Sequence, residues 1–191
     1  MQIAIFLYKI RLKLISSLYT LIGILKLNLW GVKHGKCSFR GNIIIYKHPK
    51  SKIIIGNNAR FNSDSLFNFR GLNHPCILQT GSENASIIIG DNFGASSCSI
   101  VSDCGVYIGD NVMLGANVII GDRDDHSDIY NVSPQPITIG NNVWIGMNVT
   151  IMKNVTIGNN AIVGASSLVT KNIPENEIWG GNPAHFIKKR K

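Results

Sequence analysis

The stretch IGNNVWIGMNVTIMKNVTIGNN, Ile139 to Asn160, repeats one short motif with a regular period. An aliphatic residue returns at every sixth position, at Ile139, Ile145, Ile151, Ile157, Val163 and Val169. A second small or aliphatic residue follows each of these by four positions, at Val143, Val149, Val155, Ala161, Ser167 and Ile173. Neither an α-helix nor an alternating β-strand has a period of six residues. The segment therefore belongs to a repeat architecture.

Looser copies of the same phrase occur earlier in the chain. They are Ile55 with Phe61 and Phe67, Ile89 with Ala95 and Val101, and Ile108 with Leu114 and Ile120. The phase slips by one residue between Val101 and Ile108, as a bulge or a small insertion would cause. We therefore expect the repeat to extend from residue 36 to residue 175.

The turn residues indicate how the repeats stack. The tripeptide Gly-Asn/Asp-Asn begins at Gly56, Gly90, Gly109, Gly140 and Gly158, and it supplies residues that tolerate a positive φ at a corner. From Gly140 to Gly158 is 18 residues, or three repeats. Three short strands per coil would place each inward side chain above its counterpart 18 residues earlier, with parallel strands about 4.8 Å apart. The sequence predicts an all-β solenoid, a triangular prism filled by Ile, Val and Ala.

One segment interrupts the repeat. After Ile120 the next in-phase residue would be at position 126, but the next clear run begins at Ile139. The segment 122–136 must therefore leave the prism as a loop, and it contains DRDDHSDIYN, with His126 among four aspartates. Because stacked strands form flat walls, an extruded loop is what can form a pocket, especially against a neighbouring subunit.

Composition restricts the class of protein. The chain has 191 residues, 45% hydrophobic and 16% charged, which fits one globular domain. The net charge of +8 is concentrated in KIRLK and KKRK near the two ends, without interleaved aromatic residues. This pattern argues against a nucleic-acid partner. The four cysteines (Cys37, Cys76, Cys98 and Cys104) form no CxxC pair, so we expect reduced thiols in a cytoplasmic protein.

The two ends of the chain differ from the repeat. Residues 1–35 predict an amphipathic helical segment, and residues 176–191 predict a basic tail. The longest uncharged run of the N-terminal segment, Leu14 to Leu25, is shorter than the roughly 20 residues that a membrane-spanning helix needs. Two arrangements stay open: the helix packs on its own domain, or residues 1–30 contact the inner face of the cell membrane peripherally.

At this point the chain resembles a known family, the hexapeptide-repeat acyltransferases with a left-handed parallel β-helix. Its C-terminal half is similar to the maltose and galactoside O-acetyltransferases and to the capsule and lipopolysaccharide O-acetyltransferases. The resemblance covers Ile87 to Lys191 and is most specific in VWIG, LVTK and GNPA. It implies the left-handed coil, acetyl-CoA as co-substrate, a sugar or glycan acceptor, and a homotrimer with active sites between subunits.

The resemblance also assigns a catalytic base. In this family a histidine in the extruded loop takes the proton of the acceptor hydroxyl, and here that residue is His126. An imidazole with a pKa near about 6.5 suits this step, because a sugar hydroxyl does not ionise near neutral pH. One of the loop aspartates can fix the tautomer of the ring, and we expect Asp124 to do so. The alternative is that these acidic residues only form a solvated loop.

The resemblance places the donor along the last coils. It implies that Trp144 screens the thioester, that the backbones of Met147 and Ala165 meet the pantetheine amides, and that Thr170 and Lys171 lie near the nucleotide. Relatives often have arginines where this chain has His185 and Lys188, and cations there would pair with phosphate. The alternatives are that Trp144 fills the edge of a coil and that KKRK is a solvated tail.

The acceptor side carries a weaker signal. The galactoside branch has an acceptor-contacting asparagine after IGDNF-x-A, and here Ser96 stands at that position. Asp103 lies where an acceptor carboxylate is expected, or it caps a corner. We therefore expect a glycan or a lipid-linked sugar as acceptor rather than a simple galactoside.

Other functions of the same fold would require sequence features that this chain lacks. Zinc carbonic anhydrases gather three histidines, but His34, His48, His74, His126 and His185 show no close pair and no 18-residue spacing, so we expect no metal. An amino-sugar N-acetyltransferase usually adds an N-terminal nucleotide-binding domain, for which the first 50 residues leave no room. A serine acetyltransferase would have a longer helical N-terminal region. A non-enzymatic scaffold would have no use for DRDDH.

Overall fold

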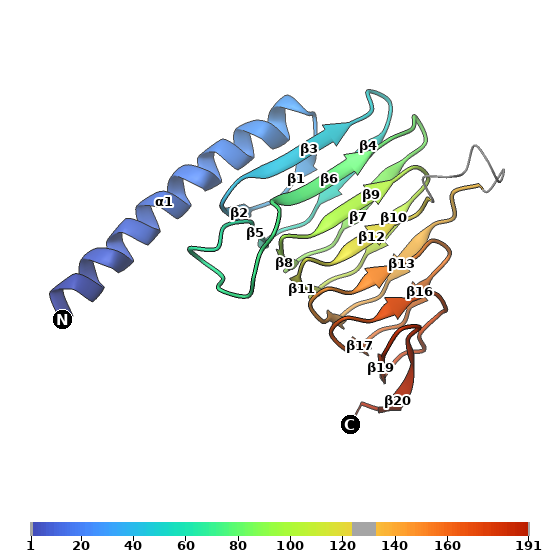
Figure 1. The fold of residues 1–191 in the computed structure, drawn as a ribbon. Coiled ribbons are helices and arrows are strands. Elements are labelled where there is room, and N and C mark those ends of the chain that lie inside the picture. Colours follow the sequence, from blue (N-terminus) through green and yellow to red (C-terminus); the bar gives the residue numbers. More distant parts are fainter. Residues whose placement is uncertain (1, 124–132, 191) are drawn as a thin grey trace.

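The computed structural model describes residues 2–123 and 133–190. These residues form one helix followed by three sheets, which are the three walls of a prism (Figure 1). The helix α1 spans Gln2–Leu29. Sheet A contains β1 (Lys33–His34), β4 (Lys52–Ile55), β7 (Ser86–Ile89), β10 (Val106–Ile108), β13 (Ile137–Ile139) and β16 (Thr156–Ile157). Sheet B contains β2 (Cys37–Arg40), β5 (Ala59–Asn62), β8 (Gly94–Ser96), β11 (Met113–Ala116), β14 (Trp144–Ile145), β17 (Ile162–Val163), β19 (Glu177–Gly180) and β20 (His185–Lys189). Sheet C contains β3 (Ile43–Lys47), β6 (Cys76–Thr80), β9 (Ser99–Ser102), β12 (Ile119–Gly121), β15 (Thr150–Ile151) and β18 (Leu168–Val169).

Successive strands go from sheet A to sheet B to sheet C, so each turn of the chain adds one strand to every wall of a prism. All pairs between coils are parallel, and in the C-terminal coils the partners are 18 residues apart, as in Ile145 and Val163. The predicted solenoid and its three-strand coil are therefore confirmed. The walls meet at three corners, which we call the A–B, B–C and C–A corners.

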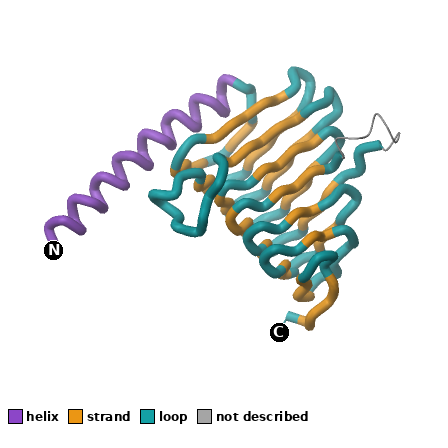
Figure 2. The backbone as a smooth tube through the Cα atoms, in the orientation of Figure 1, coloured by secondary structure: helices purple, strands orange, loops and turns teal. Residues whose placement is uncertain are grey.

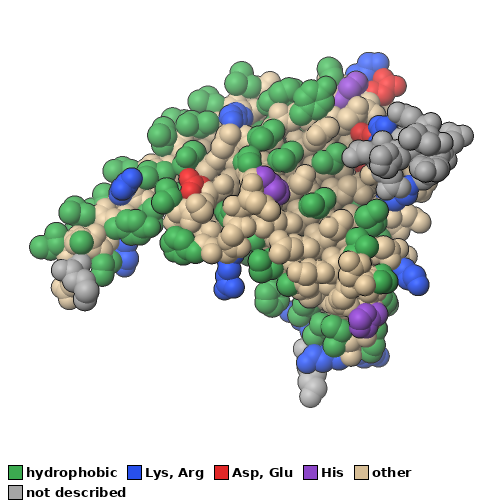
Figure 3. All heavy atoms as spheres, in the orientation of Figure 1, with side chains coloured by type: hydrophobic (Ala, Val, Ile, Leu, Met, Phe, Trp, Pro, Cys, Tyr) green, Lys and Arg blue, Asp and Glu red, His purple; other side chains and the backbone are tan. Residues whose placement is uncertain are grey.

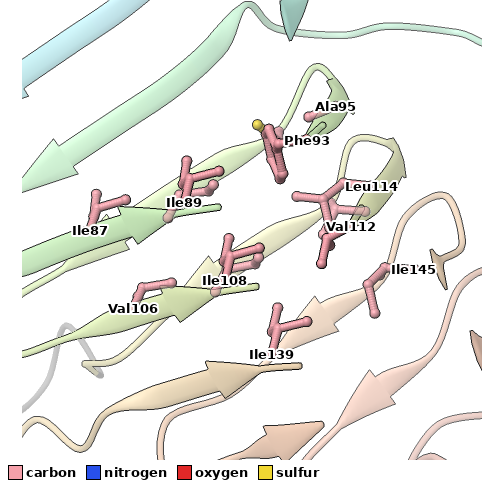
Figure 4. Close-up of a cluster of buried hydrophobic side chains, with 14 of the residues drawn as sticks. Ile87, Ile89, Phe93, Ala95, Val106, Ile108, Val112, Leu114, Ile139 and Ile145 are labelled. Carbon is pink, nitrogen blue, oxygen red and sulfur yellow. The ribbon is translucent and has the colours of Figure 1, made fainter. Parts of the chain in front are cut away.

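The core is a column of inward side chains that repeats from coil to coil. Figure 4 shows Ile89, Ile108 and Ile139 stacked from three neighbouring coils, and all three are buried. In the N-terminal coils aromatic rings fill the core. Phe39 and Phe61 stack with ring centroids 5.4 Å apart, and Phe93 packs on Phe61 at a tilt, with centroids 5.6 Å apart. Burying this apolar surface is what stabilises short strands that would not persist alone.

Two residues that appear to continue the repeat do not point into the core. Phe67 lies in a loop at residues 63–75, between β5 and β6, and the coil resumes at Cys76. Val101 is half-buried on the outside of β9, while its neighbour Ile100 is fully buried. The inward residues Ala95, Ile100 and Ile108 are five and then eight residues apart, so the period of six is broken on both sides of Ile100 and not only between Val101 and Ile108.

The A–B corner explains the Gly-Asn/Asp-Asn tripeptide. Its last residue has the positive φ, for example 58° at Asn111 and 57° at Asn142, and the amide of the Asn111 side chain donates to Asn142 at 3.1 Å. The glycine has another role. A Cβ atom on Gly109 would overlap Oδ1 of Asn141 in the next coil, so the glycine is there because the coils approach closely.

The second half of α1 covers the N-terminal end of the prism, while the first half projects beyond it (Figures 1 and 2). Leu27 is buried, and a Cβ on Gly23 would overlap the ring of Phe39. The hydroxyl of Thr20 accepts from the amide of Phe39 at 3.0 Å and therefore caps the edge of β2. The helix ends at Leu29, and the prism begins at Lys33, within the segment 1–35 that the sequence predicts to be helical.

Residues 176–190 differ from the predicted tail. β19 joins sheet B beside β17, and β20 pairs antiparallel with β19, so these residues close the C-terminal end of the prism as a hairpin. The physical reason is that β17 would otherwise present an open edge of unpaired amides and carbonyls.

Candidate active site

A groove of about 440 Å³ lies at the B–C corner of the later coils. It brings together three of the residues predicted for the donor, Trp144, Met147 and Ala165. Ser96, predicted for the acceptor, lines the same groove. The remaining lining consists of backbone and small or aliphatic side chains of the neighbouring coils together with two loop residues, Asn68 and Arg70. A volume of this size lies within the about 300–1,000 Å³ typical of small-molecule sites.

The floor of this groove consists of exposed main chain, because the corner residues Gly115 and Gly146 have no side chains. A Cβ on Gly115 would lie 2.5 Å from the amide nitrogen of Met147, and one on Gly146 would lie 2.5 Å from the amide nitrogen of Ala165. Only glycine fits at these two positions, since the coils stack backbone to backbone there. The result is a corner along which a ligand can lie directly against the main chain.

Two amides at this corner are available to a ligand. No hydrogen bond between described residues uses the N–H of Met147 or of Ala165. The neighbouring N–H of Asn148 donates to Ala116 at 2.8 Å, and that of Ser166 donates to Met147 at 2.8 Å. The two available amides are 18 residues apart in sequence, so they lie one coil apart, or about 4.8 Å. They form a pair of donors in line along the groove.

Trp144 lies on the outer face of sheet B at the edge of this groove. It pairs with Met113 in the coil before and with Ile162 in the coil after, and 58% of it is exposed. The inward position of β14 belongs to Ile145, which is fully buried. Trp144 is therefore not a filler of the coil, and a large exposed aromatic side chain here offers a flat apolar wall.

The loop 63–75 is the part of this site that sequence reasoning missed. Asn68 donates to the hydroxyl of Ser96 at 2.9 Å, which holds the loop over the groove and places Arg70 in its lining. The side chain of Asn117 donates to the carbonyl of Gly71 at 2.9 Å and fixes the loop from below. The signal that could have found it is the absence of an aliphatic residue at position 73, where the repeat that includes Phe67 would need one.

The predicted loop 122–136 begins and ends at the C–A corner. β12 ends at Gly121 and β13 begins at Ile137, and the amide of Gln135 donates to the carbonyl of Asp122 at 2.9 Å. His126 and Asp124 lie outside the described residues. The segment that carries them therefore leaves and rejoins the prism at this corner.

Asp122 anchors the start of that loop. Its carboxylate is fully buried and accepts hydrogen bonds from the Ser102 hydroxyl at 2.7 Å and from the amides of Asp103 and Gly105, each at 2.7 Å. The amide of Cys104 donates to it as well, at 3.0 Å. With its oxygens committed to these donors, Asp122 is a structural residue of the corner.

Asp103 lies at the same corner rather than in the groove. Its carboxylate pairs with the guanidinium of Arg123 at 2.7 Å. Both residues line a wider hollow of about 880 Å³ on the outer face of sheet C, with Tyr46 and Ile119. The two residues predicted for the acceptor, Ser96 and Asp103, therefore stand at opposite edges of sheet C.

The other four residues predicted for the donor are also divided between the C–A and B–C corners. Thr170 and Lys171 follow β18 and lie exposed at the C–A corner. His185 pairs with Gly180 in the C-terminal hairpin, beside Ser167 at the B–C corner, and Lys188 lies further along the same strand. Of these four residues, only His185 lies at the B–C corner, and none of the four lines the groove of its own chain.

The cysteines are poorly suited to act as a nucleophile. Burial, with a contribution from a neighbouring carboxylate, raises the pKa of Cys104 to about 11, and burial alone raises the pKa of Cys37 to about 11. Thiols with such values are protonated near neutral pH and react slowly. A hydrogen bond with Cys98 lowers the pKa of Cys76 to about 7, but both side chains are fully buried, out of reach of a substrate.

Metal ligands are not gathered in the described part of the chain. Among residues 2–123 and 133–190, no group of three His, Cys, Asp or Glu side chains is placed to hold a metal ion.

Comparison with known proteins agrees with this geometry. A family model described as bacterial transferase hexapeptide (six repeats) matches residues 136–171, and one described as hexapeptide repeat of succinyl-transferase matches residues 86–122. Curated protein sequences give no match. A maltose O-acetyltransferase from Clostridium difficile 630 is 30% identical over 84% of this chain and 70% of its own, with a TM-score of 0.53.

Two further solved structures show the range of chemistry on this fold. A galactoside acetyltransferase in complex with coenzyme A is 36% identical over 74% of this chain and 66% of its own, with a TM-score of 0.56. A mutant of AntD, an N-acyltransferase from Bacillus cereus in complex with dTDP-4-amino-4,6-dideoxyglucose and coenzyme A, is 26% identical over 87% of this chain and 88% of its own, with a TM-score of 0.68. The six-residue repeat, the three-walled prism and these likenesses agree, and the chain belongs to the hexapeptide-repeat acyltransferases, built on a left-handed parallel β-helix.

Proposed function

We propose that this protein is an acetyl-CoA-dependent O-acetyltransferase that acetylates a sugar hydroxyl of a cell-surface polysaccharide or of its precursor. The observation that carries the proposal is the groove at the B–C corner, where the available amides of Met147 and Ala165 lie in line beside Trp144. The pantetheine arm of coenzyme A is a narrow chain with two amide groups, which suits two donors spaced along a bare corner. The galactoside acetyltransferase that holds coenzyme A supports this assignment.

The acyl-transfer step needs a base and no covalent enzyme intermediate. The acceptor oxygen attacks the thioester carbonyl, the carbon–sulfur bond breaks, and the products are an acetyl ester and the thiol of coenzyme A. We assign the removal of the hydroxyl proton to His126, which then returns it to the leaving sulfur. Asp124 is the residue that we propose to orient the imidazole ring. Trp144, exposed at the groove edge, would keep water from the thioester.

The division of the site between two corners favours a homotrimer. Ala116 at the B–C corner and Asp122 at the C–A corner are six residues apart across sheet C, which is up to about 20 Å at 3.3 Å per residue. The groove and the loop that carries His126 therefore start at different edges of one chain. In a closed ring of three prisms, the groove of one subunit can meet the C–A corner of the next, so that Thr170 and Lys171 reach a donor bound by the neighbour.

The acceptor would enter beside the loop 63–75. Asn68 and Ser96 offer polar groups at the N-terminal end of the groove, and Arg70 offers a cation that can pair with an acidic sugar or a phosphate. This set differs from a site made for a neutral disaccharide. It supports a charged glycan or a phosphate-linked sugar as the acceptor.

N-acylation of an amino sugar is the second candidate, and two observations favour it. AntD matches 88% of its own length to this chain, so an N-acyltransferase does not need the added N-terminal domain that the sequence analysis expects. The TM-score to AntD is also higher than to the maltose O-acetyltransferase, 0.68 against 0.53.

The nature of the product distinguishes the two candidates. The protein is incubated with acetyl-CoA and, separately, with hydroxyl-only sugars, phosphate-linked sugars and amino sugars, while release of the coenzyme A thiol is followed. We expect turnover with a hydroxyl acceptor and a product that mild alkali hydrolyses, as an ester does. An alkali-stable amide formed only with amino sugars would establish the second candidate instead.

A further inference from the structure

An unbroken stripe of aliphatic side chains runs along the outer face of α1. Its members are separated by three or four residues, the spacing that keeps side chains on one helix face. Their exposed fractions range from 41% at Ile10 to 84% at Leu29. The stripe consists of Ile3, Leu7, Ile10, Leu14, Leu18, Leu21, Leu25 and Leu29.

The opposite face of α1 holds the helix to the prism. Gly23 and Leu27 are its buried residues, and Thr20 caps β2 from the same side. The stripe therefore points away from the domain, and no described part of the chain covers it. Figure 3 shows hydrophobic side chains along the whole projecting length of α1, with Lys and Arg among them.

The charge of this end of the molecule is one-sided. The first acidic residue of the chain is Asp64, so no Asp or Glu lies in α1 or in the first coil. The rest of the chain contains all 11 acidic residues and only eight of the 19 cationic ones. The cations before Asp64 are Lys9, Arg11, Lys13, Lys26, Lys33, Lys36, Arg40, Lys47, Lys50, Lys52 and Arg60. The end that carries the exposed apolar stripe is thus the cationic end.

We propose that α1 lies in the surface of an anionic membrane, with its stripe among the acyl chains and Lys9, Arg11 and Lys13 at the phosphates. An apolar face combined with clustered cations is what binds a helix to such a surface. A second copy of the helix is a poorer partner, because it would bring the same cations together without one acidic side chain to pair with them. The inner face of the cell membrane is rich in anionic lipids, which fits a cytoplasmic enzyme.

The helix lies on the membrane and does not cross it. By length and composition alone, α1 could span a bilayer. However, residues 16–27 are held to the prism through Ser16, Thr20, Gly23 and Leu27. The part in which every residue is exposed, residues 2–11, is about 15 Å long at 1.5 Å per residue, shorter than the about 30 Å hydrocarbon core.

Two aromatic rings lie at the C-terminal end of the stripe, next to Leu29. Trp30 follows Leu29 and contacts Tyr46 of sheet C, with ring centroids 5.7 Å apart, and both rings are exposed. Trp and Tyr prefer the boundary between headgroups and water. This pair would therefore sit at the membrane surface and set how deeply the C-terminal end of the helix enters.

The placement also brings the candidate groove near the membrane. On one side the loop 63–75 forms a hollow of about 480 Å³ with α1, lined by Leu12, Phe67 and Phe69. On the other side Asn68 and Arg70 of this loop line the groove. A membrane-bound α1 would hold this loop, and with it the acceptor end of the groove, close to sugars carried by lipids.

The test measures binding of the full-length protein to vesicles without acetyl-CoA, so its outcome is independent of the proposed reaction. Vesicles of phosphatidylcholine with phosphatidylglycerol, and of phosphatidylcholine alone, are sedimented with the protein at low and high salt. We expect binding to the anionic vesicles that weakens with salt and is at least about tenfold weaker on neutral vesicles. Replacing Lys9, Arg11 and Lys13 by Gln should remove the preference for anionic lipid.

The stripe is tested with a matched pair of double variants. Leu7→Gln with Leu14→Gln should lower binding at least about tenfold, because both side chains lose their burial in lipid while Gln keeps the helix. Phe186→Gln with Ile187→Gln changes two exposed apolar residues at the far end of the prism and should bind as wild type. Thermal unfolding confirms that each variant is folded.

Two results would overturn the proposal. One is equal vesicle binding by wild type and the Leu7→Gln, Leu14→Gln variant. The other is a lower oligomeric state of the Leu7→Gln, Leu14→Gln variant, measured by light scattering without vesicles, together with unchanged binding of this variant to vesicles. The second result would assign the stripe to contacts between copies of the chain.

Discussion

The buried carboxylate of Asp122 accepts the hydroxyl hydrogen of Ser102 at 2.7 Å, and this bond joins the start of the 122–136 loop to the coil before it. Three backbone amides, those of residues 103, 104 and 105, donate to the same carboxylate. Asp122→Ala leaves these donors buried without an acceptor, so we expect a loss of about 3 kcal/mol in the free energy of unfolding. Denaturant unfolding measures it.

The matched control is Ser102→Ala. It removes one donor and leaves the carboxylate with its backbone partners, so it should cost only about 1 kcal/mol. If Asp122→Ala is no less stable than Ser102→Ala, the carboxylate does not hold the corner.

His126→Ala tests the base. We expect turnover to fall by about 10²- to 10⁴-fold, as for lost general-base catalysis, with little change in acetyl-CoA affinity. The wild-type rate should decline below about pH 6.5, because a protonated imidazole cannot accept a proton, and this acidic limb should vanish in the variant. Asp124→Asn should have a smaller effect, since it only orients the ring. Near-normal turnover of His126→Ala would exclude this residue as the base.

Mixed oligomers test whether the site is shared between subunits. Ala165→Trp fills the groove and His126→Ala removes the base, so each variant alone should be inactive. If a groove works with the loop of the neighbouring subunit, refolding an equal mixture should restore about one quarter of the sites, because one in four adjacent pairs has both intact parts. A mixture that stays inactive would mean that one chain builds the whole site.

Alkaline behaviour tests the environment of Cys104. Its pKa rises from the ordinary 9.0 to about 11 through burial and the Asp122 carboxylate. At pH 8 alkylation should therefore be about a hundredfold slower than for a free thiol, as mass spectrometry can measure. The contribution of Cys104 to the free energy of unfolding is complete below pH 9 and is lost as the pH rises toward 11. Cys104→Ser should weaken that decline and leave the parts due to Cys37 and Cys98, whose pKa values are raised as well. Rapid alkylation at pH 8 would contradict the half-buried, hydrogen-bonded position of this thiol.

The prism could be predicted because the same inward aliphatic position recurs every six residues. Few folds have a period of six with aliphatic residues stacked 18 apart. The bounds of the 122–136 interruption follow from the missing in-phase residues before Ile139. The loop 63–75 was hidden because Phe67 falls in phase by chance. The hairpin of β19 and β20 was hidden because strand pairing at an open edge depends on the neighbouring coil and not on a local pattern.

The candidate site was predicted residue by residue but not as an arrangement. Met147 and Ala165 meet at one corner because they are 18 residues apart, one full coil. Thr170 and Lys171 come five and six residues after Ala165, which carries the chain across sheet C to the next edge. The corner at which each residue lies follows from its position within the 18-residue coil. The family resemblance assigns a role to each residue separately and does not use these positions.

We expect acetyl-CoA to bind along the groove at the B–C corner, and its dissociation constant can be measured by calorimetric titration. Calorimetric titration compares wild type with Ala165→Trp, which fills the groove at an exposed corner position, and with Thr156→Trp, the same side chain on the exposed face of sheet A. We predict about micromolar or somewhat weaker binding by wild type and by Thr156→Trp, and at least about tenfold weaker binding by a folded Ala165→Trp. Equal affinity of all three proteins would contradict the assignment of the groove to the donor.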